Sequence, residues 1–213
     1  LLLDKTKCKS NIEKMCRKAK ENDLLFRPHF KTHQSLEIGR WFKNYGVKQI
    51  TVSSLHMAMY FSKDWDDITV AFPTNILEIE KINKLSSLIK LNLLIEDIEI
   101  IHQLGNRVNS KIGLFIKVDV GYHRTGVDPM RIDKISALLN KIEEFKLLEF
   151  KGFLGHAGHS YSARNSNEIL SIHNQSITFM NQLKKEYHKR YPNLITSLGD
   201  TPTCSIADNF EGV

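Results

Sequence analysis

The stretch LFIKVDVGYHRTG, residues 114–126, joins a short apolar run to a polar segment that contains two glycines. Its first part, residues 114–119, is rich in branched apolar side chains and favours a buried β-strand. Its second part carries His and Arg side chains that a core strand would avoid. This pattern, in which polar residues begin where a buried strand ends, repeats elsewhere in the chain and determines the predicted fold.

Similar apolar runs recur along the sequence, with amphipathic stretches between them. The expected strands are residues 25–30, 49–53, 68–72, 91–95, 114–119, 150–155 and 194–198. Helical spacing places apolar residues on one face in Ile12, Met15, Cys16 and Ala19, in residues 135–145 and in residues 169–187. Apolar strands that alternate with helices predict parallel β/α units with both faces of the sheet covered.

These units favour an α/β fold of the (β/α)8 TIM type, incomplete at its C-terminal end. An eighth strand is expected near Phe210, and about 200 residues is the lower limit for this barrel. An open doubly wound sheet is the alternative. Residues 1–4 are expected to form an additional short strand. No linker or low-complexity segment interrupts the pattern, so we expect one domain over residues 1–213.

Composition excludes several protein classes. With 213 residues, 41% of them hydrophobic and 25% charged, the chain can bury one sizeable core, which argues against disorder and fibrous repeats. No apolar run approaches the roughly 20 residues that cross a bilayer, and the start lacks the order of a secretory signal. We therefore expect a soluble protein without a membrane partner.

Cysteine usage and charge give two further expectations. Cys8, Cys16 and Cys204 have none of the paired spacings of a zinc ribbon or redox motif, which favours a reducing, cytoplasmic setting. The net charge of +6 is spread over helix-like stretches without interleaved aromatic residues. We therefore interpret the lysines as solvated helix faces and expect no nucleic-acid partner.

Four polar segments follow expected strands, and barrel active sites lie at the carboxyl ends of strands. The segments are RPHFKTH (27–33), DVGYHRTG (119–126), GHAGHSY (155–161) and SLGDTPT (197–203). Lys31, at the end of the first strand, is expected to be poorly hydrated, which disfavours its ammonium form; the neutral amine can form a Schiff base with an aldehyde. A rim lysine paired with an acid is the alternative.

The last of these segments suits a phosphate group. Gly199 lets the backbone approach a ligand closely, and Ser197 and Thr201 offer hydroxyls beside free amides at a helix start. An ordinary tight turn uses the same residue types. A barrel lysine together with a phosphate-binding loop describes a pyridoxal phosphate site.

The segments RPHFKTH, ITVSS (50–54), KVDVGYHRTG (117–126), GHAGHSYS (155–162) and SLGDTPTCS (197–205) resemble, in this order, the barrel domain of fold-type III pyridoxal phosphate enzymes. The similarity is greatest to the D-threonine aldolase and D-serine dehydratase branch of the alanine racemase-like group. It covers essentially the whole chain, and RPHFKTH is its most specific element.

The resemblance implies a role for individual residues. Lys31 is the catalytic lysine that forms the Schiff base with the cofactor, Arg124 approaches the cofactor's phenolic oxygen, and His156 lies beneath its ring. Tyr161 contacts the cofactor, and Ser197, Gly199 and Thr201 bind its phosphate. Structural alternatives are an Arg124–Asp119 ion pair, a satisfied buried His156 and a packing role for Tyr161.

The implied function is a pyridoxal phosphate-dependent lyase for D-amino acids with a β-hydroxyl group, of the D-serine dehydratase or D-threonine aldolase type. The segment GHSYS favours the dehydratase. Three alternatives stay open: a non-catalytic single-barrel pyridoxal phosphate-binding protein for cofactor homeostasis, an amino-acid racemase, and a metal-dependent barrel hydrolase. The last would use the pairs His29 with His33 and His156 with His159.

The family continues beyond this endpoint with a β-rich C-terminal domain that carries a metal pair. We therefore expect a divalent metal, zinc or manganese, only together with that domain, and no metal ligands within residues 1–213. The small-molecule partner is a D-amino acid, and the full-length form is expected to be a homodimer. On this interpretation residues 1–4 pair with the absent domain, and a chain of this extent binds the cofactor weakly and turns over no substrate.

Overall fold

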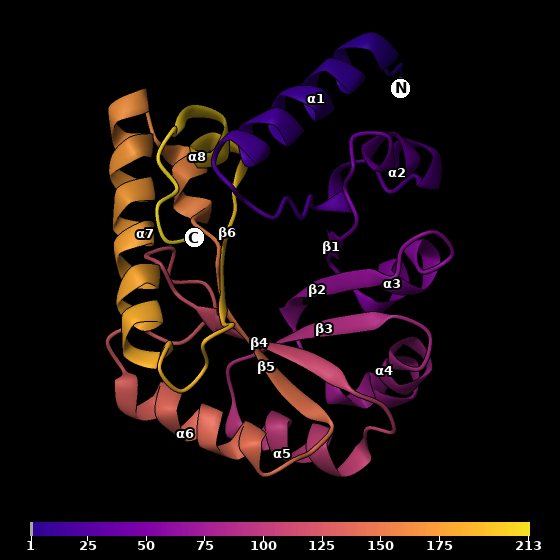
Figure 1. Cartoon of the computed structure of the whole chain (residues 1–213), viewed down its shortest axis with the longest axis vertical. Helices are drawn as coiled ribbons and strands as arrows, with labels where there is room; N and C mark the ends of the chain where they lie inside the picture. Colours follow the sequence, from indigo (N-terminus) through magenta and orange to yellow (C-terminus); the bar gives the residue numbers. More distant parts are fainter. Residues whose placement is uncertain (1) are drawn as a thin grey trace.

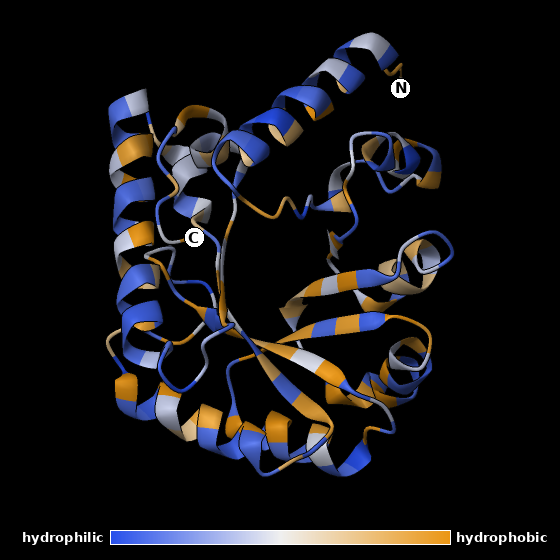
Figure 2. Cartoon of the chain, viewed as in Figure 1, coloured by the Kyte–Doolittle hydropathy of each residue, from blue (hydrophilic) through white to orange (hydrophobic). Residues whose placement is uncertain are grey.

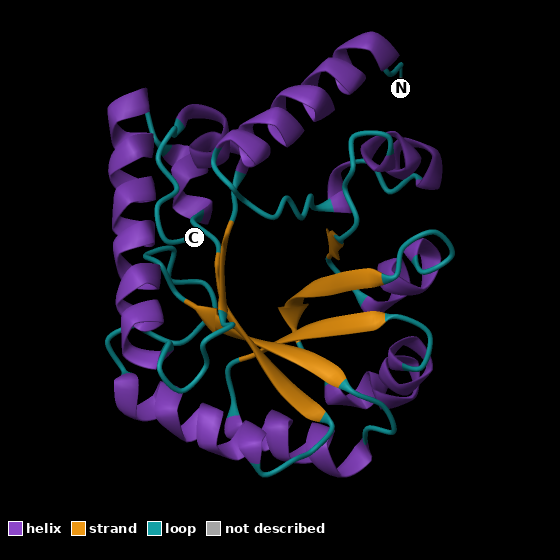
Figure 3. Ribbon diagram, in the orientation of Figure 1, coloured by secondary structure: helices purple, strands orange, loops and turns teal. Residues whose placement is uncertain are grey.

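The computed structural model describes residues 2–213, and its central feature is one curled sheet of parallel strands (Figures 1 and 3). The strands are β1 (Ile50–Val52), β2 (Asp67–Pro73), β3 (Lys90–Ile95), β4 (Ile112–Val118), β5 (Leu148–Gly155) and β6 (Ile195–Leu198). They pair in sequential order from β1 to β6, all in parallel. This order confirms the expected β/α barrel topology, here as an incomplete barrel, over an open doubly wound sheet, whose strand order would reverse.

Helices alternate with the strands. They are α1 (Lys5–Glu21), α2 (Leu36–Lys43), α3 (Leu55–Phe61), α4 (Ile79–Ser86), α5 (Ile98–Arg107), α6 (Ile132–Glu143), α7 (Ser166–Tyr187) and α8 (Thr201–Ile206). Helices α3 to α7 bury their apolar faces against the outer face of the sheet, whereas α1 packs against α2 and α8 packs against α7. Short 3-10 turns are η1 (Phe30–Thr32), η2 (Ile76–Glu78) and η3 (Gly158–Ser162). None of the helices in residues 2–213 has the length and apolar character needed to cross a membrane.

The strands consist largely of apolar residues (Figure 2), and their side chains form two hydrophobic clusters, one on each face of the sheet. In β4 every residue is buried; Leu114 and Ile116 join the large cluster between sheet and helices. Phe115 points to the opposite face and forms a small cluster with Leu94 and Leu154. Because a strand's side chains alternate between faces, the inner face also receives polar residues such as Lys117.

Three expected strands are wrong. Residues 25–30 contribute only an isolated bridge between His29 and Thr51, because Pro28 has no N–H to extend a ladder and the chain then turns into η1. The region around Phe210 is irregular and lies against α7, where Gly212 O accepts a hydrogen bond from Lys184 Nζ (3.1 Å).

The strand expected at residues 1–4 is also wrong. Residues 2–4 form no strand, and Leu1 lies outside the described residues. Asp4 is instead the N-cap of α1, and its side chain accepts a hydrogen bond from the backbone N–H of Lys7 (3.0 Å). An aspartate in this position satisfies an amide that the helix cannot pair internally. The helix is amphipathic as expected, with Ile12 and Ala19 buried.

Gly152 sits at a β-bulge where β5 pairs with both neighbouring strands, and its φ is +146°. A Cβ at this position would collide with the carbonyl oxygen of Ile195 in β6. We expect Gly152→Ala to lower the free energy of unfolding by about 3 kcal/mol, since it combines a backbone conformation unsuited to L side chains with an overpacked contact. Urea unfolding followed by circular dichroism measures this.

Gly46→Ala is the matched control, because Gly46 has a φ of +84° and open space where its Cβ would lie. It should cost only about 1 kcal/mol, the conformational part of the effect. Equal losses for the two variants would contradict a close approach between β5 and β6 at the bulge.

Candidate active site

A single cavity of about 1540 Å³ occupies the inner side of the curled sheet and its carboxyl-end rim. All seven site residues expected from the sequence line it, namely Lys31, Arg124, His156, Tyr161, Ser197, Gly199 and Thr201. They come from η1, from the segments after β4 and β5, and from β6 and the turn into α8. The structure therefore places the seven residues on one cavity, with His156 in contact with Gly199 and Tyr161 in contact with Thr201, and their individual roles stay predictions.

Lys31 differs from its expected environment. It lies on η1 at the cavity wall, but its side chain is exposed rather than desolvated. The chain turns into η1 directly after His29, and this turn places Lys31 at the rim of the cavity. Its amine is thus accessible to an entering molecule.

His29 is a site residue that the sequence analysis weighed only as a metal ligand. Its Nδ1 accepts a hydrogen bond from the backbone N–H of Lys31 (3.2 Å), so the proton of the neutral ring is assigned to Nε2. Burial, together with the nearby charges of Lys31 and His156, lowers the pKa of His29 to about 4. His29 therefore offers the cavity an N–H donor and stays neutral near pH 7.

His156 has the opposite tautomer. Its Nδ1 lies 2.7 Å from the carbonyl oxygen of Gly199, which can only accept, so Nδ1 donates and Nε2 is left as an acceptor. Burial lowers the pKa of His156, while the bond to Gly199 opposes the shift. The two histidines thus supply one donor and one acceptor to the same cavity.

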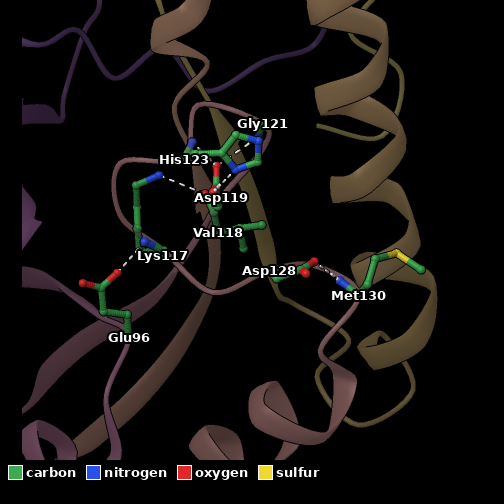
Figure 4. Close-up of polar contacts among 9 residues, drawn as sticks. Glu96, Lys117, Val118, Asp119, Gly121, His123, Asp128 and Met130 are labelled. Carbon is green, nitrogen blue, oxygen red and sulfur yellow. Dashed lines mark hydrogen bonds and ion pairs between the residues drawn. The ribbon is translucent and has the colours of Figure 1, made fainter.

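The loop after β4 is shaped by Asp119 (Figure 4). Its carboxylate accepts hydrogen bonds from the backbone N–H of Gly121 (3.0 Å) and of His123 (2.9 Å), and pairs with His123 Nδ1 (3.0 Å). Burial alone would raise the pKa of Asp119, but the bonds from His123 and Gly121 outweigh it and lower that pKa. The alternative of an Arg124–Asp119 ion pair is not found among the described residues; Arg124 lies over the ring of Tyr122, 5.0 Å from its centroid.

Lys117 is a second residue that the sequence analysis missed. It is only 6% exposed, and its Nζ donates to the carbonyl oxygen of Val118 (2.9 Å). Burial lowers the pKa of Lys117 to about 8, although Asp119 and Glu96 oppose the shift. The desolvated lysine of the site is therefore Lys117 in β4, and alternation along the strand is the signal that could have revealed it.

The segments after β5 and β6 lie against each other. Besides the His156–Gly199 bond, the backbone N–H of Thr201 donates to the Tyr161 hydroxyl (3.2 Å). The Cβ position of Gly199 faces open space, so this turn leaves room for a ligand close to its backbone.

The histidines considered as metal ligands have other environments. His33 packs among Phe30, Phe42 and Phe61, and burial lowers its pKa. His159 stacks on Tyr122. Within residues 2–213, no group of three or more His, Cys, Asp or Glu side chains is placed to hold a metal ion.

Comparison with known proteins gives consistent results. The profile of the family "Alanine racemase, N-terminal domain" matches residues 3–211. A D-serine dehydratase from Dictyostelium discoideum is 31% identical over 96% of this chain and 56% of its own length.

Among solved structures, D-threo-3-hydroxyaspartate dehydratase from Delftia sp. superimposes with a TM-score of 0.90 at 22% identity, covering 99% of this chain and 57% of that one. D-threonine aldolase from Filomicrobium marinum gives a TM-score of 0.89 at 17% identity over 97% of this chain and 57% of that one. These two likenesses concern the fold. The chain spans about half the length of the relatives that it matches.

The low pKa of His29 predicts a pH dependence of stability. An unfolded histidine binds its proton near pH 6.5, whereas His29 in the folded chain does so at about 4. Between these values the unfolded state holds more protons, so stability is lost as pH falls from about 6.5 towards 4. His29→Asn should lose less stability than the wild type over this window, as measured by urea unfolding at each pH.

His56→Asn, which changes an exposed histidine of α3, is the control and should follow the wild type. Parallel pH curves for the wild type and His29→Asn would show that His29 titrates normally.

Proposed function

This chain belongs to the alanine racemase N-terminal domain family, and on that premise we propose that it is the barrel part of a pyridoxal phosphate-dependent lyase for D-amino acids with a β-hydroxyl group. The observation that carries the proposal is the convergence of Lys31, Arg124, His156, Tyr161 and the 197–201 loop on one cavity. The relative that is 31% identical is a D-serine dehydratase, which favours dehydration over aldol cleavage.

The residues present fit the cofactor. An exposed primary amine at Lys31 suits an aldehyde, and the open space at Gly199 suits a phosphate beside backbone amides. When bound, pyridoxal phosphate supplies an electron sink for negative charge at the Cα of an amino acid. We assign covalent attachment to Lys31 and phosphate binding to Ser197, Gly199 and Thr201.

The other cavity residues orient the cofactor and substrate. Arg124 provides a cation for the phenolic oxygen, and its stacking on Tyr122 restricts its position. On this proposal His156, with Nε2 as an acceptor, would lie beneath the cofactor ring, and Tyr161 would border its phosphate. Lys31 Nζ is the amine that we assign to proton transfer at the substrate Cα, and its placement on one face would give the preference for D-amino acids.

The residues described here do not fit a metal ion, since no ligand cluster exists among residues 2–213. On this proposal residues 2–213 contribute three features to the reaction: the Lys31 amine, the Arg124 cation and the phosphate loop at residues 197–201. The homodimer and the metal of a full-length form remain predictions from the resemblance.

The first test is covalent attachment. Purified protein mixed with pyridoxal phosphate should gain a visible absorption band, and borohydride should fix the label on Lys31, as identified by peptide mass spectrometry. Lys31→Ala should abolish both, because no other exposed amine is assigned to this part of the cavity. Lys48→Ala, an exposed lysine, is the control and should keep both.

A label fixed on Lys117 instead, or a band that survives Lys31→Ala, would contradict the assignment. The substrate class has a separate test that needs no turnover: D-serine should change the absorption band of the labelled protein before reduction, and L-serine should not. Equal responses to the two enantiomers would favour a racemase.

A further inference from the structure

Two segments of the candidate site are joined through a buried carboxylate. Asp200, at the turn between β6 and α8, is 9% exposed, and its Oδ1 accepts a hydrogen bond from the Ser160 hydroxyl of η3 (2.6 Å). Ser160 itself is 1% exposed. This bond ties the expected phosphate loop to the segment that carries Tyr161.

The same carboxylate caps α8. Oδ1 also accepts from the backbone N–H of Thr203 (2.9 Å), and Oδ2 accepts from the Thr203 hydroxyl (2.7 Å). Among the ion pairs of the described residues, none involves Asp200. A buried carboxylate without a cation is costly, and the donors that surround it offset this cost only while they are held in place.

The cap determines which amides of the turn can meet a ligand. Thr203 N–H is occupied by Asp200, and Pro202 has no N–H. Thr201 N–H contacts only the hydroxyl of the exposed Tyr161, and Gly199 faces open space. With Thr203 N–H held by Asp200 and Pro202 without an N–H, Thr201 N–H at the cavity wall is the amide of this turn that a ligand could reach by displacing the Tyr161 hydroxyl.

We propose that Asp200 is a positioning residue whose bond to Ser160 holds the 197–201 loop in the conformation that recognises the phosphate of the cofactor. The inference rests on the proposed function and extends it. Asp200 and Ser160 do not touch the cofactor in this assignment. They act through the loop, so they should govern the preference for pyridoxal phosphate over pyridoxal, which lacks the phosphate.

The experiment measures binding of both aldehydes by the visible absorption band in wild type, Ser160→Ala, Asp200→Ala and Asp200→Asn. Ser160→Ala removes the hydrogen bond between Ser160 and Asp200 but leaves the Asp200 cap of α8 in place. It should reduce the preference for pyridoxal phosphate by about tenfold, the usual consequence of losing a hydrogen bond to a charged group. Asp200→Ala should reduce it more, and Asp200→Asn, which keeps an acceptor for Ser160, should retain most of it.

Affinity for pyridoxal itself should be the same in all four proteins, because Lys31 is unchanged. Asp97→Ala is the matched control, since Asp97 caps α5 through the amides of Glu99 (2.8 Å) and Ile100 (3.2 Å). It should lower stability and leave the preference unchanged.

An unchanged preference in Ser160→Ala and Asp200→Ala, with a loss of stability like that of Asp97→Ala, would overturn the inference and leave Asp200 as a helix cap. Failure of the proposed function has a different signature, because the wild type would then show no band with either aldehyde. Should Asp200→Ala unfold, Ser160→Ala and Asp200→Asn still decide the matter.

Discussion

Parallel strand direction is the constraint on which the site depends. Because every strand from β1 to β6 runs the same way, all carboxyl ends meet at one rim, and the segments that follow them must share it. Residues more than 160 positions apart in the chain, such as Lys31 and Thr201, thereby line the same cavity. The helices hold this arrangement by burying the outer face of the sheet in one continuous hydrophobic cluster.

Hydrogen bonds to the backbone then set the chemical character of the rim. The Lys31 amide bonds to Nδ1 of His29, which leaves Nε2 of His29 as a donor to the cavity. The Gly199 carbonyl bonds to Nδ1 of His156, which leaves Nε2 of His156 as an acceptor. Both rings are neutral near pH 7 because burial lowers their pKa values. Positive charge in this part of the cavity thus comes from Arg124, Lys31 and Lys117, whose pKa of about 8 leaves it mostly protonated near pH 7, a suitable setting for an anionic cofactor.

Sequence patterns predicted most of the fold and the grouping of the site residues, because strand alternation and polar strand ends are local signals. They failed at residues 25–30, where apolar composition suggested a strand but Pro28 and the turn at Phe30 prevent one. They also predicted a desolvated Lys31, whereas the buried lysine is Lys117. The exposure of Lys31 depends on the path of the chain through η1, which the residues next to it in the sequence do not reveal. Asp200 escaped notice because its partner Ser160 is distant in sequence.

The sequential strand order also bears on how the molecule folds. Each strand pairs with the next one along the chain, from Ile50 with Ile68 in β1 and β2 to Gly152 with Ile195 in β5 and β6. Loop-closure entropy rises with the length enclosed, so the early units close most cheaply and β6 closes the longest loop. The turn that follows β6, which carries the expected phosphate loop, therefore depends on the most costly loop closure in the sheet.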